Sequence, residues 1–88
     1  MKGFALIYSD SVKKYIKNLN RDVQIKIVRK LDLLLVEPKL LDIVKMSGKG
    51  DTYRVRIGGY RAIFVVDFEN KSIKIEKLDT RSGIEKHY

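Results

Sequence analysis

Cysteine is absent from this 88-residue sequence, and histidine and proline occur once each. Without cysteine the chain can form neither a disulfide framework nor a thiol nucleophile. The single histidine, His87, argues against a zinc site built by the protein, and we expect neither metal nor cofactor. The apolar runs are too short to span a bilayer, and the run Phe4–Tyr8 is too brief for a secretory leader. These absences predict a cytoplasmic protein that does not bind membranes.

Acidic residues are scarce relative to basic ones. The sequence has 11 Asp and Glu against 19 Lys and Arg, which gives a formal net charge of +8. Such a balance favours RNA, DNA or an acidic protein as partner. Basic residues are spread along the whole chain, so any basic patch has to be formed by folding. The length predicts one domain, residues 1–88, and 44% hydrophobic residues predict a globular chain.

Residues 53–66 (YRVRIGGYRAIFVV) predict two β-strands joined by a tight turn. Aromatic and β-branched residues suit a pleated, half-buried surface. Gly58–Gly59 tolerates the positive φ angles of a two-residue type I′ turn, and such a turn pairs Arg56 with Arg61. One face of the hairpin is then apolar, and we expect its two tyrosines to pack in the core rather than to stack on bases. The predicted core face is Tyr53, Val55, Ile57, Tyr60, Ala62, Phe64 and Val66.

The same alternation gathers three arginines, Arg54, Arg56 and Arg61, on the opposite face of the hairpin. Three like charges side by side disfavour folding, and no acidic residue lies near them in the sequence. A sheet face can simply be solvated, although such faces more usually mix Thr, Lys, Glu and Ser. The planar guanidinium matches phosphate and can neutralise charge that gathers on phosphorus, but it is a poor proton acceptor. The face therefore predicts a site for a polyanion that takes its general base from elsewhere.

The remaining sequence predicts an α+β fold. Residues 3–8 form an expected N-terminal strand, and two amphipathic helices follow, the second running to about Glu37 before Pro38. Three antiparallel strands complete the chain, the last over residues 72–78 with a bulge or strand end at Lys77–Leu78. We expect residues 38–50 to be a connection. The helical hairpin should cover one face of a small, mostly antiparallel twisted sheet and leave the arginine face open.

The tail, residues 79–88, shows no clear periodicity but carries groups that the arginines lack. His87 has a side chain that titrates near neutral pH. Tyr88 could transfer a proton if neighbouring arginines lower its pKa, or could stack on a base. Arg81 could swing onto the arginine face. The alternative, that His87 and Tyr88 form a frayed terminus, is the one that spacing alone favours.

The segments 44–48 (VKMSG) and 53–64 (YRVRIGGYRAIF), followed by Arg81 and the closing Tyr88, resemble the RelE branch of the RelE/ParE toxin superfamily. The pattern Y-R-x-R-x-G-x-Y-R-x-x-[FY] is its specific part, and the resemblance covers essentially the whole chain. It implies a small α+β toxin of a type II toxin–antitoxin system that binds the ribosomal A site and cuts mRNA. In this family the RNA 2′-hydroxyl attacks its adjacent phosphate, which leaves a 2′,3′-cyclic phosphate and a 5′-hydroxyl without any metal or cofactor.

Carried over by position, the resemblance implies a set of catalytic residues: Arg54, Arg56, Arg61, Arg81 and Tyr88. Arg81 would stabilise charge or help the leaving oxygen, and Tyr88 would stack on a base or take part in proton transfer. The expected RNA-binding residues are Lys45, Lys49, Arg54, Arg56, Arg61 and His87. The resemblance also implies a cognate antitoxin, small and acidic or helical, from an adjacent gene. It would wrap the toxin in a hetero-oligomer and block the arginine face or displace the tail.

The sequence departs from the family at two points. Ribosome-dependent members carry lysine where this chain has Arg54 and Arg56, and arginine hardly loses a proton, so the role of base shifts to Tyr88 or His87. The segment that follows Arg81 aligns only with one inserted residue. Two other functions stay open: a ParE-like gyrase poison of the same fold, and a non-catalytic basic module that only pairs with an antitoxin. The arginine face and the tail argue against the gyrase poison.

Overall fold

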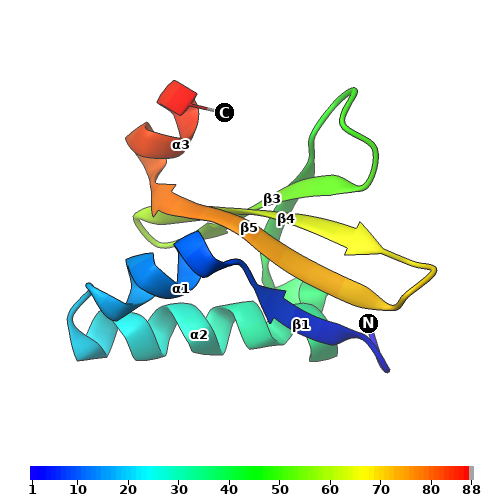
Figure 1. Cartoon of the computed structure of the whole chain (residues 1–88), viewed down its shortest axis with the longest axis horizontal. Coiled ribbons are helices and arrows are strands. Elements are labelled where there is room, and N and C mark those ends of the chain that lie inside the picture. The colour runs from blue at the N-terminus through cyan, green and yellow to red at the C-terminus, as the bar shows by residue number, and fades with distance from the viewer. Residues whose placement is uncertain (88) are drawn as a thin grey trace.

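The computed structural model describes residues 1–87, with only the backbone described for Lys86 and His87 (Figure 1). The elements follow one another along the chain in the order β1 (Ala5–Tyr8), α1 (Asp10–Lys17), α2 (Arg21–Val36), the 3-10 turn η1 (Pro38–Leu40), β2 (Asp42–Lys45), β3 (Thr52–Ile57), β4 (Tyr60–Asp67), β5 (Ser72–Thr80) and α3 (Arg81–His87). Within these described residues, no helix combines the length and the apolar character that a membrane span requires.

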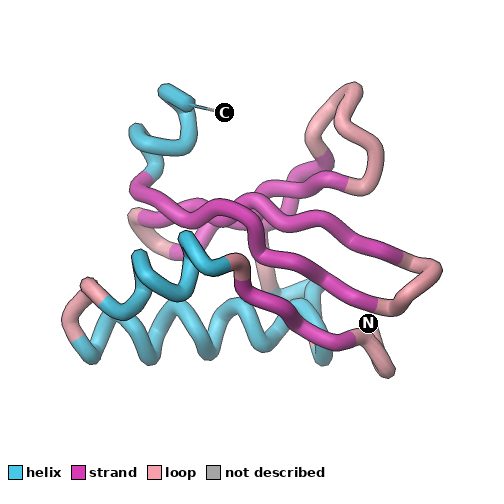
Figure 2. The backbone as a smooth tube through the Cα atoms, viewed as in Figure 1, coloured by secondary structure: helices cyan, strands magenta, loops and turns pink. Residues whose placement is uncertain are grey.

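One mixed sheet with the strand order β1-β5-β4-β3-β2 forms the centre of the molecule (Figure 2). β1 pairs in parallel with β5, and the other neighbouring strands are antiparallel. Figure 1 shows α1 and α2 beneath one face of this sheet and α3 beyond the other face. The predicted α+β class, with a helical hairpin on one face of a mostly antiparallel sheet, is confirmed.

Side-chain caps define the helical hairpin. Ser9 Oγ accepts a hydrogen bond from the Val12 amide at 3.3 Å, and Asn20 Oδ1 accepts one from the Val23 amide at 3.0 Å. Each cap satisfies an amide that the first turn of a helix leaves without a partner. Gln24 Nε2 in α2 donates to three carbonyls at the end of α1, those of Ile16, Lys17 and Leu19, at 2.7 to 3.1 Å. These bonds fix the angle at which α2 leaves α1.

The hydrophobic core lies between the helical hairpin and the sheet. Leu31 of α2 and Val55 of β3 are fully buried, and the five aliphatic and phenylalanine residues of the predicted hairpin face are at most 4% exposed. Tyr53 and Tyr60 are half-buried and pack against this core. The ring of Tyr53 stacks on that of Phe64, with centroids 5.4 Å apart. The predicted core face and the packing role of its tyrosines are therefore confirmed.

The segment expected to be a connection contains a fifth strand, so that prediction is wrong. β2 pairs antiparallel with β3 at the edge of the sheet, with Asp42 opposite Arg56 and Val44 opposite Arg54. Four residues carry too little alternation to predict a strand, and pairing with the following strand, β3, orders them. Pro38 begins η1, which leads the chain from α2 to this edge.

The expected irregularity in the last strand occurs one residue earlier than predicted. Ile63 pairs with Lys77, whereas Phe64 pairs with Ile75, so Glu76 is the additional residue of a β-bulge. The strand does not end there but continues to Thr80. This extension carries the chain past the β3–β4 turn, where α3 begins.

Candidate functional site

The β3–β4 hairpin has the predicted register: Ile57 lies opposite Tyr60, and Arg56 lies opposite Arg61. The turn differs from the type I′ expectation, because Gly58 has a φ of 57° and Gly59 does not have a positive φ. A positive φ at the first central residue alone is typical of a type II′ turn, which also matches the twist of the strands. The change of turn type leaves the pairing, and with it the face assignment, unchanged.

Arg54, Arg56 and Arg61 lie on one face of the sheet, and we refer to these three residues as the arginine site. With Asp42 and Val44 of β2 they line a narrow pocket of about 30 Å³. Arg56 is exposed, whereas Arg54 and Arg61 are partly buried. The space between the side chains is too small to enclose a nucleotide, so a ligand would contact the arginines from the surface. Such a site suits the phosphate of an extended polyanion.

Besides Asp79, which lies opposite Arg61 on β5, two acidic residues approach the arginine site, which corrects the expectation of a face without acids. Asp42 is the cross-strand partner of Arg56. Glu85 of α3 contacts Arg61, with its Oε1 3.4 Å from Arg61 Nη1. Both come from segments for which the sequence predicted no regular structure. They reduce the repulsion that three neighbouring guanidinium groups would otherwise create.

The arginine face is also less open than predicted, because α3 lies over part of it (Figure 1). The Arg61 side chain is only 13% exposed. Ile63 shares this face of the sheet and is 5% exposed, and Ile84 of α3 is 2% exposed. The expectation that Arg61 faces water is therefore wrong. The tail that seemed irregular forms a short helix that covers one end of the site.

Arg81 reaches the arginine site through Glu85. Its Nε lies 3.1 Å from Glu85 Oε1, in an i,i+4 pair on α3. The same carboxylate oxygen thus contacts Arg61 of β4 and Arg81 of α3. The Arg81 amide also donates to the carbonyl of Gly59 at 3.1 Å, which ties the start of α3 to the hairpin turn. The structure brings four of the five expected catalytic residues to one end of the sheet, and Tyr88 lies outside the described residues.

The base of α3 is fixed by three further contacts. Thr80 Oγ1 accepts a hydrogen bond from the Gly83 amide at 3.2 Å and caps the helix. The Asp79 carboxylate accepts from the Thr80 amide at 2.7 Å and from Tyr15 Oη of α1 at 3.4 Å. Gly83 lies so close to this carboxylate that a Cβ atom there would overlap it. Glycine at this position lets α3 pack directly on the end of β5.

The expected RNA-binding lysines are farther from this cluster. Lys45 pairs with Tyr53, so its side chain leaves the sheet on the face opposite the arginines. Lys49 lies in the exposed loop before β3, where its carbonyl accepts from Thr52 Oγ1 at 2.6 Å. His87 is the last residue of α3, and its side chain is among those that the structure leaves undescribed. Among the described side chains, no three His, Cys, Asp or Glu residues gather where they could hold a metal.

Two tyrosines with perturbed pKa values lie on the helical side of the sheet. Burial, followed by the negative charge of Asp32, raises the pKa of Tyr8 to about 12. Burial and the neighbouring Asp79 likewise raise the pKa of Tyr15. A phenol with a raised pKa is a weaker acid, so neither group is suited to proton transfer at neutral pH.

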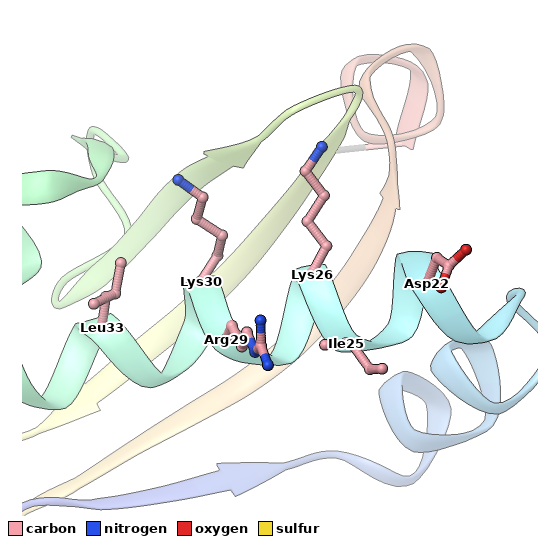
Figure 3. Close-up of a pocket in the computed structure, with 6 residues that line it drawn as sticks. All are labelled: Asp22, Ile25, Lys26, Arg29, Lys30 and Leu33. Carbon is pink, nitrogen blue, oxygen red and sulfur yellow. The ribbon is translucent and has the colours of Figure 1, made fainter.

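A second basic surface lies on α2, on the helical side of the molecule (Figure 3). A hollow of about 400 Å³ is lined by Asp22, Ile25, Lys26, Arg29, Lys30 and Leu33. All six belong to one helix, and Figure 3 shows Lys26 and Lys30 extending in the same direction. It is one exposed helix face rather than a cleft between elements. Although it is larger than the pocket at the arginine site, it brings no converging groups together for a reaction.

Comparison with known proteins assigns the chain to a family. The sequence matches no protein-family model. A chain of the archaeal RelE–RelB complex from Pyrococcus horikoshii OT3 is 32% identical, with a TM-score of 0.76, and the match covers 89% of this chain and 94% of that one. The isolated Escherichia coli RelE toxin has a TM-score of 0.73 at 21% identity, covering 96% of this chain and 93% of that one, which shows the shared fold.

A Methanocaldococcus jannaschii protein assigned as a RelE1 toxin is 39% identical over 46 residues. That match spans about half of each protein, 52% of this chain and 51% of the relative. The likeness to the Pyrococcus horikoshii chain, in contrast, covers nearly the whole of both chains. The chain belongs to the RelE toxin family.

Proposed function

We propose that this chain is the toxin of a type II toxin–antitoxin system and acts as a ribosome-dependent mRNA endoribonuclease. The observation that carries the proposal is the cluster of three arginines on one sheet face of a RelE fold, joined to Arg81 through Glu85. Guanidinium groups present paired donors to phosphate oxygens. Their convergence on one surface suits a phosphodiester better than it suits a neutral substrate.

The proposed reaction is an attack by the RNA on itself. The 2′-hydroxyl attacks the adjacent phosphorus, the bond from phosphorus to the 5′-oxygen breaks, and a 2′,3′-cyclic phosphate and a 5′-hydroxyl remain. Negative charge grows on the phosphoryl oxygens in the transition state, where Arg54, Arg56 and Arg61 would neutralise it. Arg81, at the start of α3, would stabilise charge in the transition state or help the leaving oxygen. The guanidinium groups supply the positive charge that this displacement requires.

The ribosome has a clear physical role in this proposal. The arginine site is a surface with a pocket of only about 30 Å³, so it cannot by itself bend RNA into the in-line geometry of attack. A message held in the ribosomal A site would already be positioned. The net charge of +8 favours binding to ribosomal RNA. We expect the protein to act in the cytoplasm, where translating ribosomes are found.

The proposed partner of the free toxin is an antitoxin encoded next to it. The Pyrococcus horikoshii relative and a structural neighbour from Methanococcus jannaschii were both solved as complexes of RelE with RelB. A small acidic or helical protein would match the charge of this chain and form a hetero-oligomer with it. An antitoxin over the arginine site or α3 would block access to RNA.

A purified translation system tests this function. At toxin concentrations that match the ribosomes, we expect message to be cut while it is translated and naked RNA of the same sequence to remain intact. The co-purified product of the adjacent gene should suppress the cutting. An intact message under translation would contradict the proposal and would leave the chain as a non-catalytic binding module. Inhibition of DNA gyrase supercoiling in a parallel assay would instead identify a gyrase poison.

A further inference from the structure

RNA cleavage at the arginine site requires a group that can accept the proton of the 2′-hydroxyl. Arginine stays protonated at any physiological pH and cannot accept it. The described residues that contribute carboxylates beside the arginines are Asp42, Glu85 and Asp79. Asp79 already accepts hydrogen bonds from the Thr80 amide and Tyr15 Oη, which leaves Asp42 and Glu85 as the candidates. The base has to be the carboxylate that lies within reach of the reacting atoms.

We propose that Glu85 is the general base of this site, an inference that rests on the proposed nuclease function. Glu85 contacts Arg61 at 3.4 Å and Arg81 at 3.1 Å, and so lies beside two of the arginines expected to contact the reacting phosphate. Asp42 lies on β2, at the edge of the sheet, opposite Arg56. Asp42 lines the pocket with the three residues of the arginine site, whereas Glu85 is the carboxylate that links Arg61 to Arg81.

The contacts of Glu85 leave one of its oxygens for proton transfer. Both ion pairs involve Oε1, and among the described residues Oε2 makes no hydrogen bond. The side chain is 49% exposed, so an RNA chain on the surface can reach it. The two guanidinium groups would hold Oε1 and direct Oε2 outward. A base must lie within hydrogen-bond reach of the proton it removes, and α3 provides this position above the sheet.

The proposed cleavage step conserves protons and electrons. Glu85 Oε2 takes the proton of the 2′-hydroxyl as the 2′-oxygen bonds to phosphorus. The bond from phosphorus to the 5′-oxygen breaks, and that oxygen takes a proton from solvent water. Glu85 then returns its proton to solvent. Each step is acid–base chemistry, and a positioned general base typically contributes about 10²–10⁴-fold to the rate.

The local fold positions Glu85 for this role. Thr80 caps α3, and the Arg81 amide donates to the carbonyl of Gly59 in the hairpin turn. Ile84, the residue before Glu85, is buried and anchors the helix. Two charged groups face Glu85: Arg61 from β4 and Arg81 from α3. On β5, Lys77 and Asp79 occupy the neighbouring positions opposite Ile63 and Arg61, and the Asp79 carboxylate is bonded to Tyr15.

In the competing interpretation, the Glu85 carboxylate has no part in proton transfer. It occupies the place of a phosphate and holds α3 over Arg61, and we call this role a latch. Half-exposed ion pairs contribute little net stability, so such a latch would change the population of a closed state by only about fivefold. The two interpretations predict opposite results when the charge is removed. If Glu85 is a latch, removing its charge should raise cleavage activity above wild type. If Glu85 is the base, removing its charge should lower it.

The test is Glu85→Gln, which keeps the size and hydrogen-bonding shape of the side chain but cannot accept a proton. With programmed translating ribosomes, we expect single-turnover cleavage to fall about 10²–10⁴-fold. Binding to ribosomes that carry a message with 2′-deoxyribose at the cut position should stay equal or become tighter, because a negative charge is lost. Glu69→Gln, in the exposed β4–β5 turn, is the matched control and should retain wild-type cleavage and binding.

The pH profile adds a readout that a structural role would not change. The wild-type rate should rise through the acidic range in which carboxylic acids ionise, and the Glu85→Gln rate should lose that rise. Glu85→Asp should recover part of the lost rate. If the wild-type protein cleaves message, two results would overturn the assignment of Glu85 as base. The first is a Glu85→Gln variant that is as active as wild type or more active. The second is a loss of activity in Asp42→Asn where Glu85→Gln shows none. If wild-type protein cuts no message, the proposed function fails first.

Discussion

Arg61 occupies the most connected position of the arginine site. It lies opposite Arg56 on β3 and opposite Asp79 on β5, and Glu85 of α3 contacts its guanidinium. Its side chain is 13% exposed, so it is held by its neighbours rather than extended into water. A preorganised charge stabilises a transition state without first paying for its own ordering. This makes Arg61 the side chain whose loss should affect the proposed chemistry most.

We predict that Arg61→Ala abolishes mRNA cleavage in the purified translation system, with a loss of a hundredfold or more. The protein should stay folded, and the free energy of unfolding should fall by about 0.5–3 kcal/mol, because a mostly buried side chain is lost while Glu85 keeps its contact with Arg81. Urea denaturation followed by circular dichroism measures this. Arg29→Ala on α2 is the matched control, and equal cleavage by both variants would contradict the assignment.

Tyr8 and Tyr15 allow a test of the helical side that is independent of function. Tyr8 Oη is buried and has no hydrogen-bond partner among the described residues, whereas Tyr15 Oη donates to Asp79. We predict that Tyr8→Phe leaves the free energy of unfolding unchanged or raises it by up to about 1 kcal/mol, and that Tyr15→Phe lowers it by about 0.5–1.5 kcal/mol. Urea titrations at pH 7 compare the two variants.

The pKa of Tyr8 also gives this test a pH dependence. Its folded value of about 12 lies above the ordinary value of 10.0, so the folded state binds the proton more tightly. The stability linked to this group is complete below pH 10 and is lost as the pH rises from 10 toward 12. Tyr8→Phe should therefore show a shallower alkaline loss of stability than wild type. An identical alkaline limb in both proteins would contradict the burial of this hydroxyl.

At the scale of elements, the β3–β4 turn determines the register on which the site depends. Gly58 has a φ of 57°, and neither Gly58 nor Gly59 has an atom within 4 Å of the position a Cβ would take. We predict that Gly58→Ala lowers the free energy of unfolding by about 1–2 kcal/mol, since an L-residue is strained in the left-handed region. Gly59→Ala should change it by less than about 1 kcal/mol. Thermal or urea unfolding compares the pair, and equal effects would rule out the type II′ turn.

The same elements show how far the sequence predicts the site. Strong alternation about Gly58–Gly59 was sufficient to predict the core face and the arginine face, because a two-residue turn leaves one register. Asp42 and Glu85 were not predicted to approach the arginines. β2 has four residues, and α3 has seven residues with Gly83 at its centre, so neither shows a clear period. Their structure depends on pairing with β3 and on packing against β4 and β5, which local patterns do not reveal.

At the scale of the whole molecule, the sheet separates a packed side from the side that carries the arginine site. The helical hairpin lies on one side of the sheet and α3 on the other (Figure 1). On that other side, Glu85 of α3 contacts Arg61. The likeness to RelE structures extends over nearly the whole chain, so the family and the fold could be inferred from the resemblance of the hairpin and tail. The placement of a carboxylate between Arg61 and Arg81 required the three-dimensional structure.

The central claim is that this surface promotes attack by the RNA 2′-hydroxyl on its own phosphate. The most direct measurement maps the cut position on a translated message and then replaces the ribose before the cut with 2′-deoxyribose. We predict that cleavage at that bond disappears and that the unmodified message yields 2′,3′-cyclic phosphate and 5′-hydroxyl ends. Continued cleavage of the 2′-deoxy message, or ends that carry a 5′-phosphate, would contradict the account.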